Sequence, residues 1–171
     1  KKIFVTQGYI CRNAKGEVDN LKRGGSDYTA SLIAAAVHAS VCEIWTDIDG
    51  MHNNDPRVVE KTLAIEQLSF DEAAEMATFG AKVLHPATIL PASRAGISVF
   101  VGSSRAPEQG GTWIEKEKSQ HPGIRAVTQR KNQILLTLKS PEMLLASGFL
   151  ARVFNILSEY NISVDLVTTS E

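Results

Sequence analysis

The sequence lacks long apolar runs, basic clusters and a leader-like N-terminus. Its longest apolar stretch, residues 30–41, contains His38 and Ser40 and is too short to span a bilayer. The formal net charge is -1 and no basic run stands out, which argues against nucleic acid as a partner. The first residues form no apolar signal-peptide core and include no starting Met, so we expect a truncated or processed chain.

Cysteine is scarce as well. Cys11 and Cys42 form no Cys-x-x-Cys pair, and the histidines share no metal-ligand spacing. We therefore predict two free thiols, a reducing cytoplasm as the location, and no metal site built from side chains. Hydrophobic residues make up 43% of the 171 residues and charged residues 22%, which predicts a packed core in one domain or slightly more.

Strand and helix patterns alternate along most of the chain. Residues 3–10 predict a strand, the polar residues 13–20 predict a hairpin or loop, and the Ala-rich residues 28–39 predict a helix capped by Ser26 or Asp27. A strand is then expected over 43–46 and a tight turn over 47–50. The capping box Ser69–Glu72 predicts a helix that runs through Met76. A further helix is expected from Pro86 to near Gly96, followed by an uncharged strand over 97–101. This order predicts an α/β fold with a mostly parallel sheet covered on both faces.

The pattern changes near residue 130. Residues 134–138 predict a strand, residues 147–159 an amphipathic helix, and residues 162–168 a second strand. One helix and two strands are marginal as an independent domain. We therefore divide the chain into residues 1–128 and 129–171, and expect both ends to be cut off.

Three segments carry candidate chemistry. Residues 23–27 combine Arg, two Gly, Ser and Asp just before a helix, which suits an anion held by backbone N–H groups and by a guanidinium fork, although a plain turn with a helix cap fits equally well. Residues 46–57 follow a strand directly, where ligands bind in open α/β sheets, although an acidic turn is the simpler interpretation. In residues 79–86, Lys82 suits either a phosphate contact or an ordinary surface position, and His85 is expected to be structural.

Together these segments resemble one family. Lys-Arg-Gly-Gly-Ser-Asp-Tyr-Thr-Ala at 22–30, Ile-Trp-Thr-Asp-Ile-Asp-Gly at 44–50, Asp-Pro-Arg at 55–57 and the run from Glu72 to Thr88 resemble aspartate kinase. Residues 132–171 resemble the first part of its regulatory ACT region, and the ending 163–171 is most similar to the monofunctional, lysine-sensitive type.

The resemblance implies a fold, a reaction and a set of partners. The fold would be part of the three-layer amino-acid kinase sandwich, followed by a truncated α+β ACT-like unit. The reaction would convert ATP and L-aspartate into 4-phospho-L-aspartate and ADP, with Mg²⁺ bound through the nucleotide. L-lysine would be the feedback inhibitor, and a homodimer would form through the ACT regions.

The resemblance also implies three groups of site residues. The aspartate pocket would contain Tyr9, Arg23, Gly24, Gly25, Ser26 and Asp27. The ATP site would contain Thr46, Asp47, His52, Arg57, Lys82 and Val83. The effector pocket would contain Met143, Ala146, Gly148, Phe149, Leu150, Ser163, Val164, Asp165, Ser170 and Glu171.

The chain also departs from the family's pattern. Lys22 stands where the family usually has Gly, His52 where it usually has Tyr, and Ala146 where it has a polar residue. The family's Lys-Phe-Gly-Gly segment, which supplies a catalytic lysine and phosphate-binding glycines, is not in the sequence. We therefore expect the fragment to be inactive alone. Two alternatives stay open: a kinase of the same fold acting on glutamate or carbamate, and a non-catalytic amino-acid-binding regulatory subunit.

Overall fold

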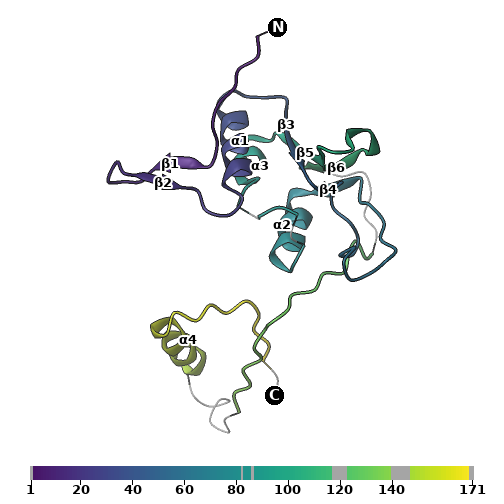
Figure 1. Ribbon diagram of the computed structural model, residues 1–171. Helices are drawn as coiled ribbons and strands as arrows, with labels where there is room; N and C mark the ends of the chain where they lie inside the picture. Colours follow the sequence, from purple (N-terminus) through teal and green to yellow (C-terminus); the bar gives the residue numbers. More distant parts are fainter. Residues whose placement is uncertain (1, 82, 86, 117–122, 140–146, 170–171) are drawn as a thin grey trace. The chain divides into compact units, whose positions relative to one another are not determined.

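The computed structural model describes residues 2–81, 83–85, 87–116, 123–139 and 147–169 (Figure 1). The chain separates into two compact units, residues 1–131 and 132–171. Within the described residues, no helix is long and apolar enough to cross a membrane.

The first unit opens with a short hairpin. β1 (Ile10–Arg12) pairs antiparallel with β2 (Val18–Asn20), so of the hairpin or loop expected over residues 13–20 the hairpin is confirmed. The strand expected over residues 3–10 is wrong for most of its length, because residues 2–7 pair with no other strand. Apolar side chains alone do not make a strand, since its backbone groups need a ladder partner.

α1 (Gly25–Ala36) follows the hairpin and begins three residues earlier than predicted. Its N-cap is Gly24, at φ 73°, and no side chain caps the first turn. The prediction that Ser26 or Asp27 caps the helix is therefore wrong. A left-handed residue ahead of the helix suits Gly, so both side chains fall inside the first turn instead.

The main sheet has four strands in the order β3-β5-β6-β4. They are β3 (Val41–Thr46), β4 (Gln67–Ser69), β5 (Ser98–Ser103) and β6 (Gly111–Glu115). β3 runs parallel to β5, and β4 runs parallel to β6, but β5 and β6 are antiparallel. The sheet is thus mixed rather than mostly parallel, because β6, which the sequence patterns missed, returns through the short 3₁₀ turn η1 (Pro107–Gln109).

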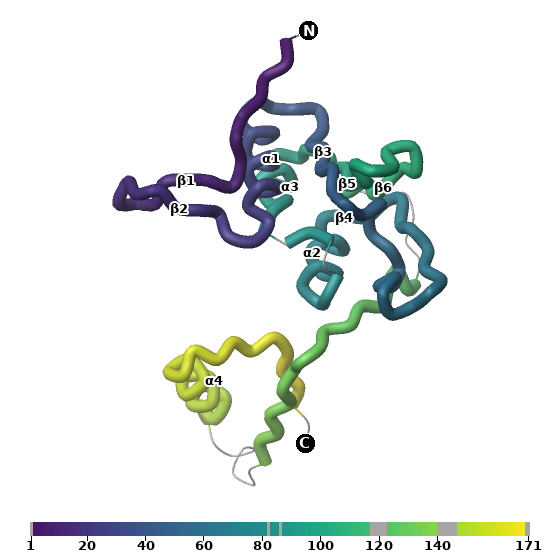
Figure 2. Tube along the Cα trace, viewed as in Figure 1, coloured from purple at the N-terminus to yellow at the C-terminus, as the bar shows by residue number. Residues whose placement is uncertain are grey.

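Three helices supply the core on one face of this sheet. α1 packs on β3 and on α3 (Leu90–Ala95), α3 packs on β5, and α2 (Phe70–Thr78) packs on β4 and β6. The inward strand residues, among them Leu68, Val99 and Ile114, are fully buried. Figure 2 traces the chain from β4 directly into α2.

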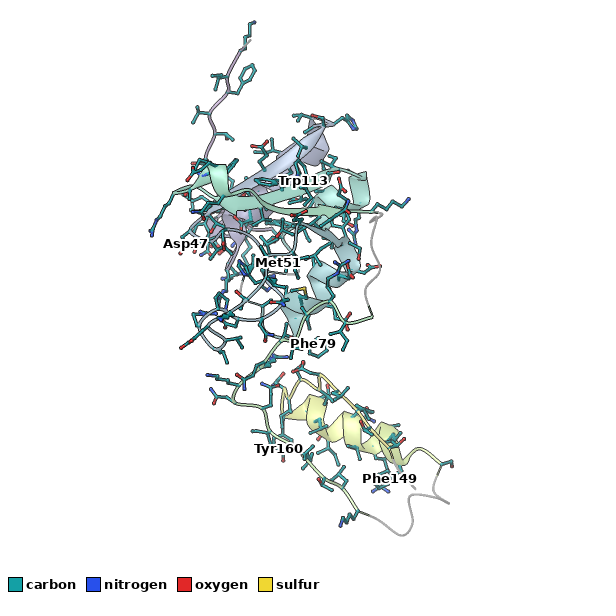
Figure 3. All side chains as sticks on the ribbon, turned by 90° about the vertical axis from the view of Figure 1, so that its right-hand side faces the viewer. Asp47, Met51, Phe79, Trp113, Phe149 and Tyr160 are labelled. Atoms are coloured by element: carbon teal, nitrogen blue, oxygen red, sulfur yellow. The ribbon has the colours of Figure 1, made fainter. Side chains whose placement is uncertain are left out.

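The opposite face of the sheet carries aromatic side chains. The Trp45 and Phe100 rings lie 5.4 Å apart, and the Phe100 and Trp113 rings lie 5.0 Å apart. Both tryptophans are exposed, so the expectation of cover on both faces is wrong for the described residues. Figure 3 shows Trp113 at the sheet and Met51, which is fully buried, within the same unit.

Two helix ends predicted from local sequence signals, the start of α2 and the end of α3, are found in the structure. Ser69 accepts from the Glu72 N–H, and the Glu72 carboxylate accepts from the Ser69 N–H, so the predicted capping box is confirmed. α3 ends at Gly96, at φ 68°, as expected. It begins at Leu90, however, and the predicted start at Pro86 lies outside the described residues.

The second unit contains a single described helix, α4 (Phe149–Glu159), close to the predicted range. The predictions of strands over 134–138 and 162–168 are wrong, because the structure assigns neither segment to a strand. Alternating apolar residues favour a strand only where a neighbour accepts its backbone hydrogen bonds.

Candidate functional site

A cleft of about 620 Å³ lies where the hairpin meets the start of α1. All six residues predicted for the aspartate pocket line it, and so do Asn20 and Lys22, which were not predicted. The lining residues are Tyr9, Asn20, Lys22, Arg23, Gly24, Gly25, Ser26 and Asp27. The sequence missed Asn20, which bonds the backbone N–H of Lys22 at 3.0 Å, because its role appears only once β2 is placed beside the helix.

The two glycines allow a close approach that other residues would block. A Cβ at Gly24 would lie 2.6 Å from Thr88 Cγ2, and one at Gly25 would lie 2.9 Å from Tyr9 Cδ2. The Gly25 carbonyl accepts from the Thr29 hydroxyl at 2.8 Å, and that hydroxyl accepts from the Tyr9 N–H at 3.1 Å. The start of α1 is thereby held against the hairpin.

The charges at the cleft suit an amino-acid carboxylate. The Gly25 N–H donates to the Lys22 carbonyl at 3.1 Å, but no side chain caps the N–H groups of Ser26 and Asp27. These two groups and the exposed guanidinium of Arg23 favour an anion. Asp27 is half-buried in the same turn, and burial raises its pKa. The site thus offers donors for a carboxylate beside an acceptor for an ammonium group.

Cys42 lies on the buried face of β3 and is a free thiol, as is Cys11. Burial raises the pKa of Cys42, and the negative charges of Asp27 and Glu43 raise it further. Both observations agree with the prediction of unbridged cysteines.

The carboxyl end of β3 forms a second candidate area. Thr46 is the last residue of β3, and Asp47 follows it (Figure 3 labels Asp47). The Thr46 hydroxyl lies 3.1 Å from the Asp47 carboxylate. The Thr46 carbonyl accepts from the Ser104 N–H at 2.8 Å and from its hydroxyl at 3.0 Å. Ser104 is not predicted from the sequence, because its only signal there is its place after the neighbouring parallel strand β5.

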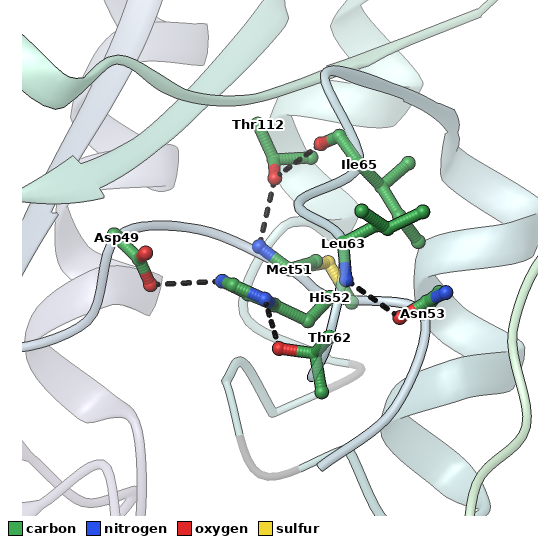
Figure 4. A network of polar contacts seen from close by, with 8 residues as sticks. All are labelled: Asp49, Met51, His52, Asn53, Thr62, Leu63, Ile65 and Thr112. Atoms are coloured by element: carbon green, nitrogen blue, oxygen red, sulfur yellow. Dashed lines mark hydrogen bonds and ion pairs between the residues drawn. The ribbon is translucent and has the colours of Figure 1, made fainter. Parts of the chain in front are cut away.

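The loop after Asp47 is held by side-chain contacts. His52 bonds Asp49 at 3.0 Å and Thr62 at 2.8 Å through its two ring nitrogens (Figure 4). Arg57 forms two bonds of 2.9 Å with the Asp55 carboxylate, and these bonds raise the pKa of Arg57. Thr62 gave no signal in the sequence, because it lies ten positions from its partner.

In the segment that contains Lys82, the described residues His85 and Thr88 border the cleft at Gly24. Val83 packs against the core, and His85 lies near Gly24. The His85 Nδ1 accepts from the Ala87 N–H at 3.3 Å, in agreement with its expected structural role. Lys82 lies outside the described residues.

The predicted effector residues fall in the second unit. Gly148, at φ 82°, is the N-cap of α4, and Phe149 and Leu150 form its first turn. Ser163, Val164 and Asp165 lie in an exposed segment without regular structure. The other four, Met143, Ala146, Ser170 and Glu171, lie outside the described residues.

In the described part of the chain, no three His, Cys, Asp or Glu side chains are grouped to hold a metal ion. The donor set therefore does not form a protein-only metal cage. A hard cation such as Mg²⁺ is commonly held by one or two carboxylates together with substrate phosphates. The exposed Asp47 carboxylate beside the Thr46 hydroxyl fits that kind of site.

Comparison with known proteins identifies the protein family of the chain. The model of the amino acid kinase family matches residues 1–103, so the chain belongs to the amino acid kinase family. The α/β fold and the cleft at the start of α1 agree with this assignment. Among individual relatives, lysine-sensitive aspartokinase 3 of Escherichia coli is 57% identical over 169 residues, which are 99% of this chain and 38% of the relative.

Two further comparisons also match aspartokinases. The aspartokinase of Chlamydia pneumoniae is 39% identical over 96% of this chain and 38% of its own length. The crystal structure of E. coli aspartokinase III in complex with aspartate and ADP matches with a TM-score of 0.83 at 57% identity, over 96% of this chain and 37% of that one. The chain thus spans a little over a third of the length of these relatives.

Proposed function

We propose that the protein containing these residues is an aspartate kinase, which transfers the γ-phosphoryl group of ATP to the side-chain carboxylate of L-aspartate. The products are 4-phospho-L-aspartate and ADP, and the reaction opens the synthesis of lysine, threonine and methionine. The observation that carries the proposal is the cleft that brings Arg23 and Asp27 together with the uncapped N–H groups of Ser26 and Asp27 at the start of α1. The 57% identity to a lysine-sensitive aspartokinase across 99% of the chain supports it.

The proposed chemistry explains which side chains the site needs. The acceptor is already a carboxylate, so no strong general base is required. The difficulty is to bring one anion to another, and catalysis then depends on positioning and on positive charge. Arg23 and the first turn of α1 orient the acceptor, while Asp27 suits its ammonium group.

The nucleotide is assigned to the carboxyl end of β3. Thr46 and Asp47 would hold the nucleotide or its cation there, and His52, Arg57, Lys82 and Val83 complete the proposed ATP site. Mg²⁺, bound through the phosphates, would supply neutralising charge to the transferred group. The glycine-rich Lys-Phe-Gly-Gly segment of the family is absent from these 171 residues, so we expect no turnover from them alone.

Regulation is assigned to residues 129–171, as the start of an ACT region that binds L-lysine. The left-handed Gly148 leaves the first N–H groups of α4 available for the effector's α-carboxylate. Met143, Ala146, Ser163, Asp165, Ser170 and Glu171 belong to the same proposed pocket. The resemblance further supports a homodimer through these regions, a cytoplasmic location, and neither nucleic acid nor membrane as a partner. Asp165→Ala should weaken lysine inhibition, and inhibition by threonine alone would contradict the lysine assignment.

The function is tested by trapping the product of the full-length protein. Purified protein is incubated with ATP, Mg²⁺ and hydroxylamine, which displaces phosphate from an acyl phosphate to form a hydroxamate. Added ferric ion then gives a coloured complex with the hydroxamate. Aspartate, glutamate and carbamate are compared as acceptors. We expect product with aspartate alone; product with glutamate or carbamate instead, or ATP binding without any turnover, would contradict the proposal.

A further inference from the structure

Two short segments of the first unit, residues 49–53 and 62–65, lie side by side (Figure 4). His52 and Ala64 form an isolated antiparallel bridge between them. The Asn53 N–H donates to the Leu63 carbonyl at 3.0 Å, and the Leu63 N–H donates to the Asn53 side-chain oxygen at 2.9 Å. The eight residues between Asn53 and Thr62, which include Arg57, therefore form a loop with a fixed base.

The His52 ring joins the two sides of this base. Its Nε2 lies 3.0 Å from Asp49 Oδ1, and its Nδ1 lies 2.8 Å from Thr62 Oγ1. Only 15% of the side chain is exposed. Because a carboxylate only accepts, Nε2 donates to Asp49; the Thr62 hydroxyl can donate to a neutral ring or accept from a charged one. The contact thus persists in either charge state, and it leaves no ring nitrogen for a ligand.

Thr112 on β6 anchors the base to the sheet. Its hydroxyl accepts from the Met51 N–H at 2.7 Å and donates to the Ile65 carbonyl at 2.7 Å. Thr112 and Met51 are fully buried, and Ile65 is nearly so. The two segments are therefore tied to the same strand as well as to each other.

We propose that Asp49, His52 and Thr62 form a positioning clamp that fixes the loop carrying Arg57 for nucleotide binding. The His52 ring has no nitrogen left to bind the nucleotide, and the three residues act by holding the loop between Asp47 and Arg57. The inference rests on the proposed function, because it assigns that loop to ATP. It also gives His52 a positioning role in place of the direct nucleotide contact that the family resemblance implies.

The test uses the full-length protein with variants that break or keep the clamp. Thr62→Val and Asp49→Ala each remove one partner of the ring, whereas Thr62→Ser and Asp49→Asn keep a hydroxyl and an acceptor. Thr78→Val is the matched control, since its hydroxyl bonds only the Ala74 carbonyl on the surface of α2. Loss of one such bond should raise the KM for ATP about three- to tenfold.

If the clamp positions the loop, these variants should change the KM for ATP selectively. The KM for aspartate should stay unchanged in all variants, and Thr62→Ser should restore the KM for ATP where Thr62→Val does not. A general loss of folded protein would lower the apparent kcat and leave both KM values unchanged, and that result would overturn the proposal. An unchanged KM for ATP in both Thr62→Val and Asp49→Ala would overturn it equally.

A second measurement separates this inference from the proposed function. If the wild-type protein phosphorylates no aspartate, the function is wrong, but amide hydrogen exchange still reports on the clamp. Peptides covering residues 49–65 should exchange about tenfold faster in Thr62→Val than in wild type, as local opening becomes easier. Peptides covering α1 should exchange at the same rate in both proteins. Equal exchange over 49–65 would show that the clamp does not hold the loop.

Discussion

Replacing Thr112 by Val should destabilise the first unit strongly, although the two side chains have nearly the same shape. The Thr112 hydroxyl serves two buried backbone groups, the Met51 N–H and the Ile65 carbonyl, each at 2.7 Å. Val leaves both without this partner. The two unsatisfied groups cost about 1–3 kcal/mol each, or about 4 kcal/mol together at the middle of that range, and the extra buried methyl group returns about 0.8 kcal/mol at most. The net loss should therefore be about 3 kcal/mol.

Urea denaturation of the 171-residue chain, followed by tryptophan fluorescence, measures this loss. Both tryptophans, Trp45 and Trp113, lie on the sheet that contains Thr112, so they report on the relevant unit. With a slope of about 1–3 kcal/mol per molar urea, the midpoint should fall by about 1–2 M. Thr78→Val, at an exposed hydroxyl, should change the unfolding free energy by about 0.5 kcal/mol or less. A similar small change for Thr112→Val would refute the reasoning.

Three further changes test other parts of the fold by the same denaturation assay. Gly24→Ala should lower the free energy of unfolding by about 2–3 kcal/mol, because it combines a left-handed backbone with the close contacts described above. Gly96→Ala, which has open space around it, should lower it by about 1 kcal/mol. Equal losses would contradict the contact argument. Ser69→Ala should cost about 1 kcal/mol through loss of the capping box, and the exposed Ser158→Ala should cost less. Burial raises the pKa of Asp27 above its ordinary 3.8, so the stability that it contributes is complete below 3.8 and is lost as the pH rises through the folded value. Asp27→Asn should therefore be more stable than wild type at about pH 7, and the difference should shrink towards acid; a constant difference would contradict the pKa argument.

The parts of the fold that depend on local signals could be predicted from sequence. The capping box at Ser69 and the left-handed Gly96 specify their helix ends within a few residues, and the uncharged residues 97–101 identify the central strand. β6 was missed because Gly111–Glu115 is short and follows a turn whose antiparallel return no local pattern specifies.

Non-local contacts account for the remaining errors. The residues over 134–138 and 162–168 have strand-like composition, yet the described structure provides no ladder partner for them. In the cleft, Arg23 to Asp27 can be predicted because they are contiguous, whereas Asn20 reaches it from β2. At the end of β3, Ser104 reaches the Thr46 carbonyl from beyond β5. Pairings of this kind become visible only when the strand order is known.

The central claim is that the cleft at the start of α1 binds the acceptor carboxylate, with Arg23 as its guanidinium fork. Steady-state kinetics of the full-length protein carrying Arg23→Lys tests it most directly, since Lys keeps the charge but cannot form the bidentate contact. The KM for aspartate should rise about tenfold or more, while the KM for ATP stays near the wild-type value. Wild-type kinetics in Arg23→Lys, or a rise confined to the KM for ATP, would contradict the assignment of this cleft to aspartate.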